Sequence, residues 1–175
     1  MFSELLVSGE VAAGLPEGYE LRPLRRADFR RGYLDVLRVT GKVGAVGERA
    51  WEERFEWLRR NNETYYILVI VNEEERVVAG GTLMVERKFT NNCSLIGHIE
   101  DVAVARTEKG KKMGLRMLDA LTHISKELGC IRSIVGCAEQ NDAFHAQRGF
   151  VKEGIVMVLK HALPRSRSPA VINKF

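Results

Sequence analysis

The residues from Glu108 to Leu118, EKGKKMGLRML, contain two glycines and three lysines directly before an apolar stretch with helical spacing. Gly110 and Gly114 allow the backbone to turn, or to approach a ligand closely, without the steric cost of a Cβ atom. The first turn of a helix carries unpaired backbone N–H groups and a partial positive charge, which favour phosphate groups. The segment lacks the endings of the P-loop and dinucleotide-binding glycine motifs. Composition alone therefore leaves two hypotheses open, an anion site and a solvated basic turn.

The elements that would position this segment alternate between strand patterns and helix patterns. Three apolar runs, at residues 64–72, 77–89 and 94–105, are separated by polar turns, which is typical of an antiparallel meander. Residues 113–129 carry apolar side chains at spacings of three and four, which predicts an amphipathic helix with Gly129 as its C-terminal cap. The lysine-rich segment is thus expected to connect a strand to the start of a helix.

Shorter elements complete the expected order. They are a strand ending at Pro23, a helix beginning near Asp28, two helices within 33–61, a strand at 130–138, a helical piece at 141–150 and a last strand at 154–163. The alternation without an internal linker predicts one α/β domain from residue 1 to residue 162. Residues 163–175 contain prolines, serines and basic residues, and we expect a basic tail there.

Composition argues against several classes of protein. The chain has 175 residues, of which 45% are apolar and 29% charged, as in soluble globular proteins. Its longest apolar strand pattern, residues 65–71, is far shorter than the roughly 20 residues of a membrane-spanning helix. The net charge of +4, with interspersed signs and 7% aromatic residues, favours small anionic ligands over nucleic acid. Three cysteines without a C-x-x-C pair, and no secretory leader, predict a cytoplasmic protein without a metal site.

Several motifs carry a resemblance. IGHIEDVAV (96–104), GKKMGLRMLDAL (110–121) and QNDAFHAQRGF (140–150) together resemble the signature region of the GNAT superfamily of acyl-CoA N-acetyltransferases. GTLMVERKF (81–89) before GHIEDVAV is similar, more narrowly, to the glucosamine-6-phosphate N-acetyltransferase family. The resemblance implies an α/β (α+β) GNAT fold, in which a single mixed, mostly antiparallel twisted sheet is flanked by helices. A bulge near the EDVAV strand would split this sheet at the acetyl-CoA cleft.

The resemblance also implies how acetyl-CoA, the co-substrate, is held. Its pantetheine arm would pair with the strand backbone, and its pyrophosphate would lie on the glycine- and lysine-bearing loop. The implied cofactor-binding residues are Val102, Ala103, Val104, Gly110, Lys111, Lys112, Met113, Gly114, Leu115, Gly136 and Asn141.

The implied reaction is acetyl transfer to the amine of glucosamine 6-phosphate, by direct attack without an acyl-enzyme, for UDP-N-acetylglucosamine synthesis. His145, at the position of the family's tyrosine that donates to the leaving sulfur, and Asp101 are the implied catalytic residues. A homodimer is expected, with the last strand near the partner's site. The implied substrate-binding residues are Thr40, Lys88, Phe89, Thr90, Asn91, Glu100, Asp101, Val102, Ile131, Arg132 and Lys160.

Four positions depart from the family's pattern. Asn91 replaces a turn histidine, Gly136 an acid, His145 the tyrosine, and Lys160 a basic residue that is often arginine. With an ordinary pKa near ~6.5, an imidazolium at position 145 could protonate a thiolate at neutral pH. Two alternatives stay open. One is a catalytically impaired homologue that binds CoA or an amino sugar as a regulatory dimer, and the other is an N-acetyltransferase for another amine.

Overall fold

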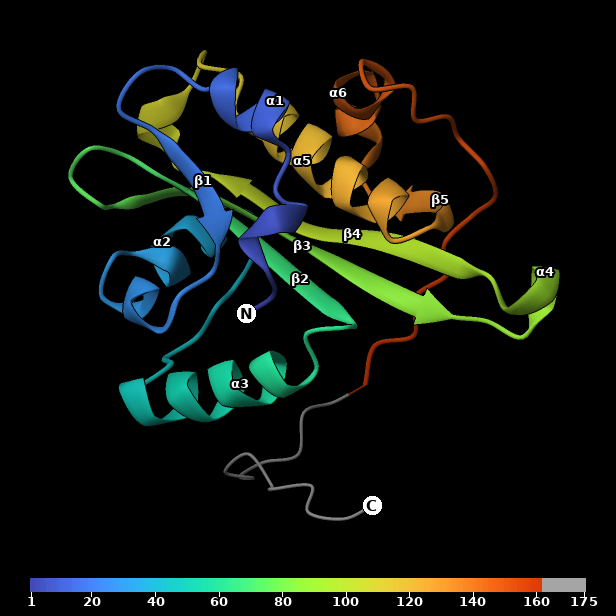
Figure 1. Ribbon diagram of the computed structural model, residues 1–175, viewed down its shortest axis with the longest axis horizontal. Helices are drawn as coiled ribbons and strands as arrows, with labels where there is room; N and C mark the ends of the chain where they lie inside the picture. The colour runs from blue at the N-terminus through green and yellow to red at the C-terminus, as the bar shows by residue number, and fades with distance from the viewer. Residues whose placement is uncertain (162–175) are drawn as a thin grey trace.

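The structure is a computed structural model that describes residues 1–161 (Figure 1). Within these residues the strands form one five-stranded sheet in the order β1-β2-β3-β4-β5. The first four strands pair antiparallel with their neighbours, and β5 pairs parallel with β4. The expected mixed, mostly antiparallel sheet and its central meander are therefore confirmed. The strands are β1 (Glu20–Pro23), β2 (Tyr65–Val71), β3 (Val77–Arg87), β4 (Leu95–Val104) and β5 (Cys130–Val135).

Helices cover both faces of the sheet (Figure 1). Helix α5 packs on one face, and α2 and α3 pack on the other, which separates two apolar clusters. The α-helices are α1 (Gly9–Ala13), α2 (Tyr33–Leu37), α3 (Glu48–Arg60), α4 (Thr90–Cys93), α5 (Met113–Glu127) and α6 (Asp142–Ala146). The 3₁₀ helices are η1 (Glu4–Leu6), η2 (Arg26–Phe29), η3 (Arg106–Glu108) and η4 (Glu139–Asn141).

The packing of α5 against the sheet explains two features of the sequence. Strand β2 is covered on both faces, so its apolar run does not alternate with polar residues, and Leu68 is fully buried. Gly81 of β3 allows α5 to lie close to the sheet, because a Cβ atom there would stand 2.8 Å from both Leu121 Cδ1 and Met117 Cγ. This contact fixes the position of α5, whose first turn carries the lysine-rich loop.

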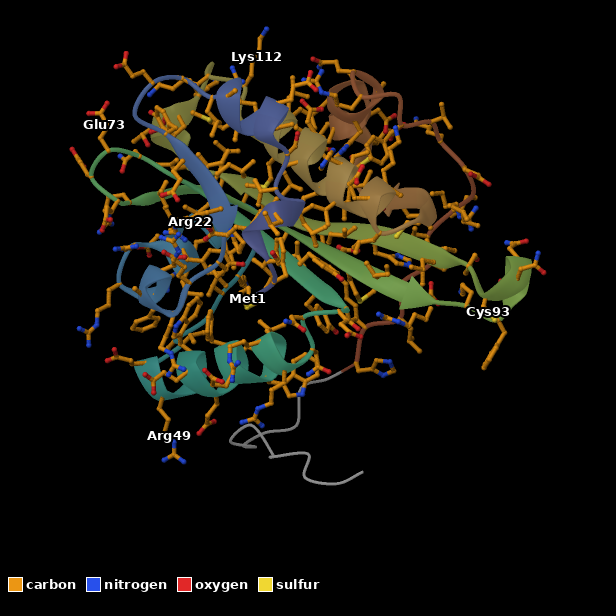
Figure 2. All side chains as sticks on the ribbon, in the orientation of Figure 1. Met1, Arg22, Arg49, Glu73, Cys93 and Lys112 are labelled. Carbon is orange, nitrogen blue, oxygen red and sulfur yellow. The ribbon has the colours of Figure 1, made fainter. Side chains whose placement is uncertain are left out.

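A buried ion pair joins β1 to the segment before α2. Arg22, labelled in Figure 2, donates two hydrogen bonds of 2.8 Å to the carboxylate of Asp28, and both side chains are buried. The backbone N–H of Arg25 donates to the same carboxylate. The helix predicted near Asp28 is the 3₁₀ helix η2, and the hydrogen bond from the Arg25 backbone N–H to the Asp28 carboxylate caps its first turn. Removing one partner would leave a buried charge, which costs about 3–5 kcal/mol.

The prediction of a last strand at 154–163 is wrong for the part that the structure describes. Residues 151–161 form no strand, and their apolar side chains are exposed; Ile155, for example, is 93% exposed. A strand requires a neighbour to pair its backbone groups, and residues 1–161 supply none for this segment. The predicted basic tail, residues 163–175, lies outside the described residues.

Candidate active site

A bulge in β4 changes which side chains face α5. The pairing of β3 with β4 changes register between Gly80 and Thr82, so that Asp101 and Val102 lie opposite one residue of β3. Asp101 has φ 55°, a left-handed conformation that aspartate tolerates better than most residues. Ile99 packs on the α5 side before the bulge and Val102 after it, whereas regular alternation would place Asp101 there. The bulge therefore redirects the second half of β4.

A cavity of about 480 Å³ opens where β4 and β5 cease to pair. The last pair of the two strands is Ile99 with Val135, directly before the bulge. The walls come from β4, the lysine-rich loop, the start of α5, the end of β5 and α6. The lining residues are Thr40, Ile99, Glu100, Asp101, Val102, Val104, Glu108, Lys109, Gly110, Lys112, Met113, Gly114, Val135, Gly136, Cys137, Ala138, Asn141, Phe144 and His145.

The lysine-rich loop closes this cavity at the N-terminus of α5. Gly110 has φ 90° and Lys112, the N-cap of α5, has φ 58°, so the loop turns through two left-handed residues. The first turn of α5 contains no acidic residue, and its positive partial charge is left for a ligand. Gly114 allows α6 to approach, because a Cβ atom there would lie 3.0 Å from Phe144 Cζ. The loop lies in a cavity wall, which favours the anion site over the solvated turn.

The three lysines of the loop have different surroundings. Lys109 and Lys112 line the cavity, and Figure 2 shows Lys112 at the upper edge of the molecule. Lys111 is instead 2.9 Å from a carboxylate oxygen of Glu108, which is 7% exposed, and 2.7 Å from the hydroxyl of Tyr19. Burial acts to raise the pKa of Glu108, but hydrogen bonds from Tyr19 and Lys111 lower it overall. The side chain of Lys111 is therefore engaged within the protein.

Most of the residues predicted to bind the cofactor line the cavity. Three of them do not. Ala103 is buried against the α2 and α3 side, Leu115 is buried in the core, and Lys111 is ion-paired as described. The predicted residues found in the lining are Val102, Val104, Gly110, Lys112, Met113, Gly114, Gly136 and Asn141.

His145 lies in the cavity wall and is 8% exposed. Its ring makes edge contacts with Phe144 and Phe150, at centroid distances of 5.0 and 6.0 Å. Burial lowers the pKa of His145, while the charge of Asp142 opposes this shift. This shift disfavours the imidazolium considered from the sequence and favours the neutral imidazole. Its Nδ1 is buried and has no hydrogen-bond partner among residues 1–161, so a polar atom of a ligand would satisfy it.

Some of the predicted substrate-binding residues meet at the bulge. Thr40, Glu100, Asp101 and Val102 all line the cavity. Thr40 follows α2, and its hydroxyl donates to the carbonyl of Leu37 at 3.1 Å. Asp101 is exposed and lines the cavity, so its charge is available to a cationic substrate amine.

Most of the other predicted substrate-binding residues lie at the opposite end of β4. The β3–β4 connection, which contains α4, lies at the far tip of the sheet (Figure 1) and includes Lys88, Phe89, Thr90 and Asn91. Ile131 and Arg132 lie beside them at the start of β5, where Leu95 pairs with Cys130. Lys160 is on the exposed segment 151–161. None of these seven residues lines the cavity, so the chain divides the predicted substrate site into two groups.

Lys88 already has an acidic partner at that tip. Its Nζ lies 2.7 Å from one oxygen of Glu86, and His98 Nε2 lies 3.0 Å from the other. Hydrogen bonds from Lys88 and then from His98 lower the pKa of Glu86. A phosphate group at Lys88 would therefore compete with a carboxylate.

Sequence reasoning assigned no role to Glu108 or Phe144, although both line the cavity. A signal for Glu108 existed, since it is the one acid beside three lysines in the loop. Phe144 gave no such signal, because an apolar residue in a short helix is usually part of a core.

Two kinds of feature are absent from the part of the chain that the structure describes. Residues 1–161 contain no group of three or more His, Cys, Asp or Glu side chains placed to hold a metal ion. None of the helices in this range combines the length and the apolar character needed to cross a membrane.

The match to a family model covers most of the sheet and the whole cavity. Residues 21–150 match the model described as "Acetyltransferase (GNAT) family". Among curated proteins, the chain is 35% identical over 146 residues to glucosamine 6-phosphate N-acetyltransferase of Candida albicans, covering 83% of this chain and 98% of that protein. It is 34% identical over 149 residues to glucosamine 6-phosphate N-acetyltransferase 1 of Oryza sativa subsp. japonica, covering 85% and 90%.

The fold matches a solved structure at similar identity. The crystal structure of glucosamine-6-phosphate N-acetyltransferase from Arabidopsis thaliana superposes with a TM-score of 0.80 and 31% identity, covering 83% of this chain and 100% of that one. The resemblance drawn from the motifs around the bulge and the loop is thereby confirmed.

Proposed function

Because the chain belongs to the acetyltransferase (GNAT) family, we propose that it transfers the acetyl group of acetyl-CoA to the amine of glucosamine 6-phosphate. Relatives with that activity in their names match most of this chain and nearly all of their own length. The observation that carries the proposal is the cavity at the β4 bulge, which gathers the implied residues Asp101 and His145 with the loop before α5.

The cavity has groups suited to two parts of acetyl-CoA, the pantetheine arm and the pyrophosphate. Beyond Ile99, β5 no longer pairs with β4, so the backbone groups on that edge of β4 are available to the amides of pantetheine. The backbone N–H groups at the start of α5, with Lys109 and Lys112, provide positive potential for the pyrophosphate. The thioester would then lie between the bulge and α6.

The reaction follows from the groups around that position. The amine nitrogen attacks the thioester carbonyl, the C–N bond forms, and the carbonyl oxygen gains negative charge that the backbone N–H near Val102 stabilises. The carboxylate of Asp101 holds the substrate ammonium, which releases one proton to water to become the attacking amine, and Asp101 accepts the second proton from the nitrogen once it has attacked. The C–S bond then breaks, and His145 donates an N–H hydrogen bond to the departing sulfur. The proton released from nitrogen finally neutralises the thiolate.

The protein acts as a homodimer in this proposal. The apolar segment 151–161 is exposed, and β5 is an edge strand with one side unpaired among the described residues. A second copy of the chain would cover this apolar surface and pair its backbone groups. It would also bring Lys160 toward the partner's site. Predicted substrate-binding residues that lie apart in one chain would then lie together in the dimer.

Sedimentation equilibrium tests this arrangement. The wild-type protein is expected to have twice the chain mass of 19.7 kDa, and Met157→Asp, a change at a 92% exposed residue, is expected to yield monomers. Leu5→Asp, the same kind of change at a 95% exposed residue elsewhere, should leave the dimer intact. A wild-type monomer at tens of micromolar would contradict the dimer.

Lys88→Ala tests recognition of the phosphate. In the proposed dimer Lys88 would contact the sugar phosphate in the partner's cavity. The variant is therefore expected to raise KM for glucosamine 6-phosphate about tenfold and to change KM for unphosphorylated glucosamine less than about twofold. Glu86→Gln removes the competing carboxylate and should lower KM for the phosphosugar. Equal effects of Lys88→Ala on both sugars would argue against a phosphate contact.

A further inference from the structure

Glu108 is an unexpected residue in an anion-binding wall. Its carboxylate is almost completely buried under the loop, and it lines both the main cavity and a smaller one beside α2. An unpaired carboxylate at this place would repel the pyrophosphate of CoA and would be costly to bury. The side chain must therefore be neutralised within the protein.

Two groups from different parts of the chain perform this neutralisation. The hydroxyl of Tyr19, beside β1, donates to Glu108 Oε2 at 2.7 Å. Lys111 Nζ lies 2.9 Å from the same oxygen and 2.7 Å from the Tyr19 hydroxyl, and it also stands 5.2 Å from the centre of the Tyr19 ring. The three side chains thus connect β1, η3 and the loop at one point.

The loop itself has few other restraints. Gly110 has no heavy atom within 4 Å of the position its Cβ would take, and Lys112 is a non-glycine residue in a left-handed conformation. Neither Lys109 nor Lys112 forms an ion pair within residues 1–161, and both line the cavity. The backbone N–H groups of Lys109 and Lys111 pair within the turn, with the carbonyls of Arg106 and Glu108. The side-chain contacts of Lys111 tie the middle of the loop to Tyr19, and so to β1.

We infer that Glu108 is a positioning residue for the cofactor loop, and that Lys111 serves as its counter-ion while Lys109 and Lys112 face the phosphates of CoA. This inference rests on the proposed use of the cavity for acetyl-CoA. Together, Glu108, Tyr19 and Lys111 hold the backbone N–H groups of the loop in the arrangement that accepts an anion. Lys111 therefore acts on the cofactor only through the position of the loop.

The direction in which Glu108→Gln changes CoA affinity distinguishes this role from the alternative that Lys111 binds phosphate directly. If Lys111 were itself a phosphate ligand, Glu108→Gln would release it, remove a negative charge and tighten CoA binding. The positioning role predicts the opposite, a weakening of CoA binding by about tenfold, because the loop loses its charged tie. Isothermal titration of the full-length protein with CoA measures this directly.

Three companion variants sharpen the measurement. Lys111→Met should weaken CoA binding to a similar extent, and the double variant with Glu108→Gln should be no weaker than the worse single variant, since both changes break one pair. Lys109→Met should instead combine additively with Glu108→Gln. Tyr19→Phe removes only a hydroxyl and should weaken binding about threefold, which keeps the test available if Glu108→Gln fails to fold.

Steady-state kinetics distinguishes positioning of the loop from a purely structural role, which would not change KM for acetyl-CoA selectively. Glu108→Gln should raise KM for acetyl-CoA while kcat at saturating acetyl-CoA stays within about twofold of wild type. Wild-type affinity for CoA in both Glu108→Gln and Tyr19→Phe, or tighter binding in either, would overturn the inference about Glu108 and leave the proposed function intact. Absence of CoA binding by the wild-type protein would contradict the proposed function as well.

Discussion

Replacing His145 with phenylalanine is expected to lower kcat for acetyl transfer to glucosamine 6-phosphate about 100-fold. The KM for each substrate should change no more than about twofold, because a group that stabilises the leaving sulfur acts mainly in the transition state. Phenylalanine retains an aromatic ring against Phe144 and Phe150, so the packing of α6 is preserved. The variant therefore removes the polar nitrogen atoms and little else.

A tyrosine at position 145 is the matched control. His145→Tyr places a phenol where the family resemblance has one, and it should recover about tenfold in kcat relative to His145→Phe. Both variants should unfold at similar temperatures, which thermal denaturation checks. A wild-type kcat in His145→Phe would exclude His145 from the chemistry.

The second large effect is expected at the bulge. Asp101→Asn should lower kcat/KM for glucosamine 6-phosphate about 100-fold, since the carboxylate that binds and deprotonates the amine is lost. Asparagine also tolerates the left-handed conformation that residue 101 adopts, so the bulge should persist. Initial rates over a range of sugar concentrations measure the effect.

Glycine at the same position separates charge from backbone geometry. Asp101→Gly removes the carboxylate and also relieves the steric cost of φ 55°, so it should be at least as stable as wild type and as inactive as Asp101→Asn. An Asp101→Asn enzyme with activity near wild type would show that the bulge matters for its geometry alone.

The fold was predictable to the extent that local patterns decide it. The apolar runs of β3 and β4 and the helical spacing of α5 reflect burial against the core, which the sequence displays residue by residue. The segment 154–161 has an equally good strand pattern, but a strand needs a partner edge, and the pattern contains no information about where that edge is. The prediction of a last strand therefore failed in the chain taken alone.

The site was predictable in its position more than in its electrostatics. The motif placed Gly110, Lys112 and Gly114 in a cavity wall, as the structure does. Lys111 was grouped with them because it stands between them in the sequence, yet Glu108 and Tyr19 hold its ammonium elsewhere. The contact with Tyr19 joins residues that are 92 positions apart, so no local pattern could reveal it.

The position of His145 illustrates a related limit. At its ordinary pKa a part of the His145 population would be imidazolium at neutral pH, whereas burial lowers the pKa and so reduces that part. The residue type was visible in the sequence, whereas its protonation depends on how α6 packs over the cavity.

Release of CoA thiol from acetyl-CoA by the purified protein, with glucosamine 6-phosphate as acceptor, tests the central claim most directly. The account predicts release that depends on glucosamine 6-phosphate and that forms one N-acetylated sugar for each thiol. Release only with another amine would support a different acceptor. No release above background, together with clear thermal stabilisation by CoA, would contradict the proposed activity and indicate a CoA-binding protein that has lost turnover.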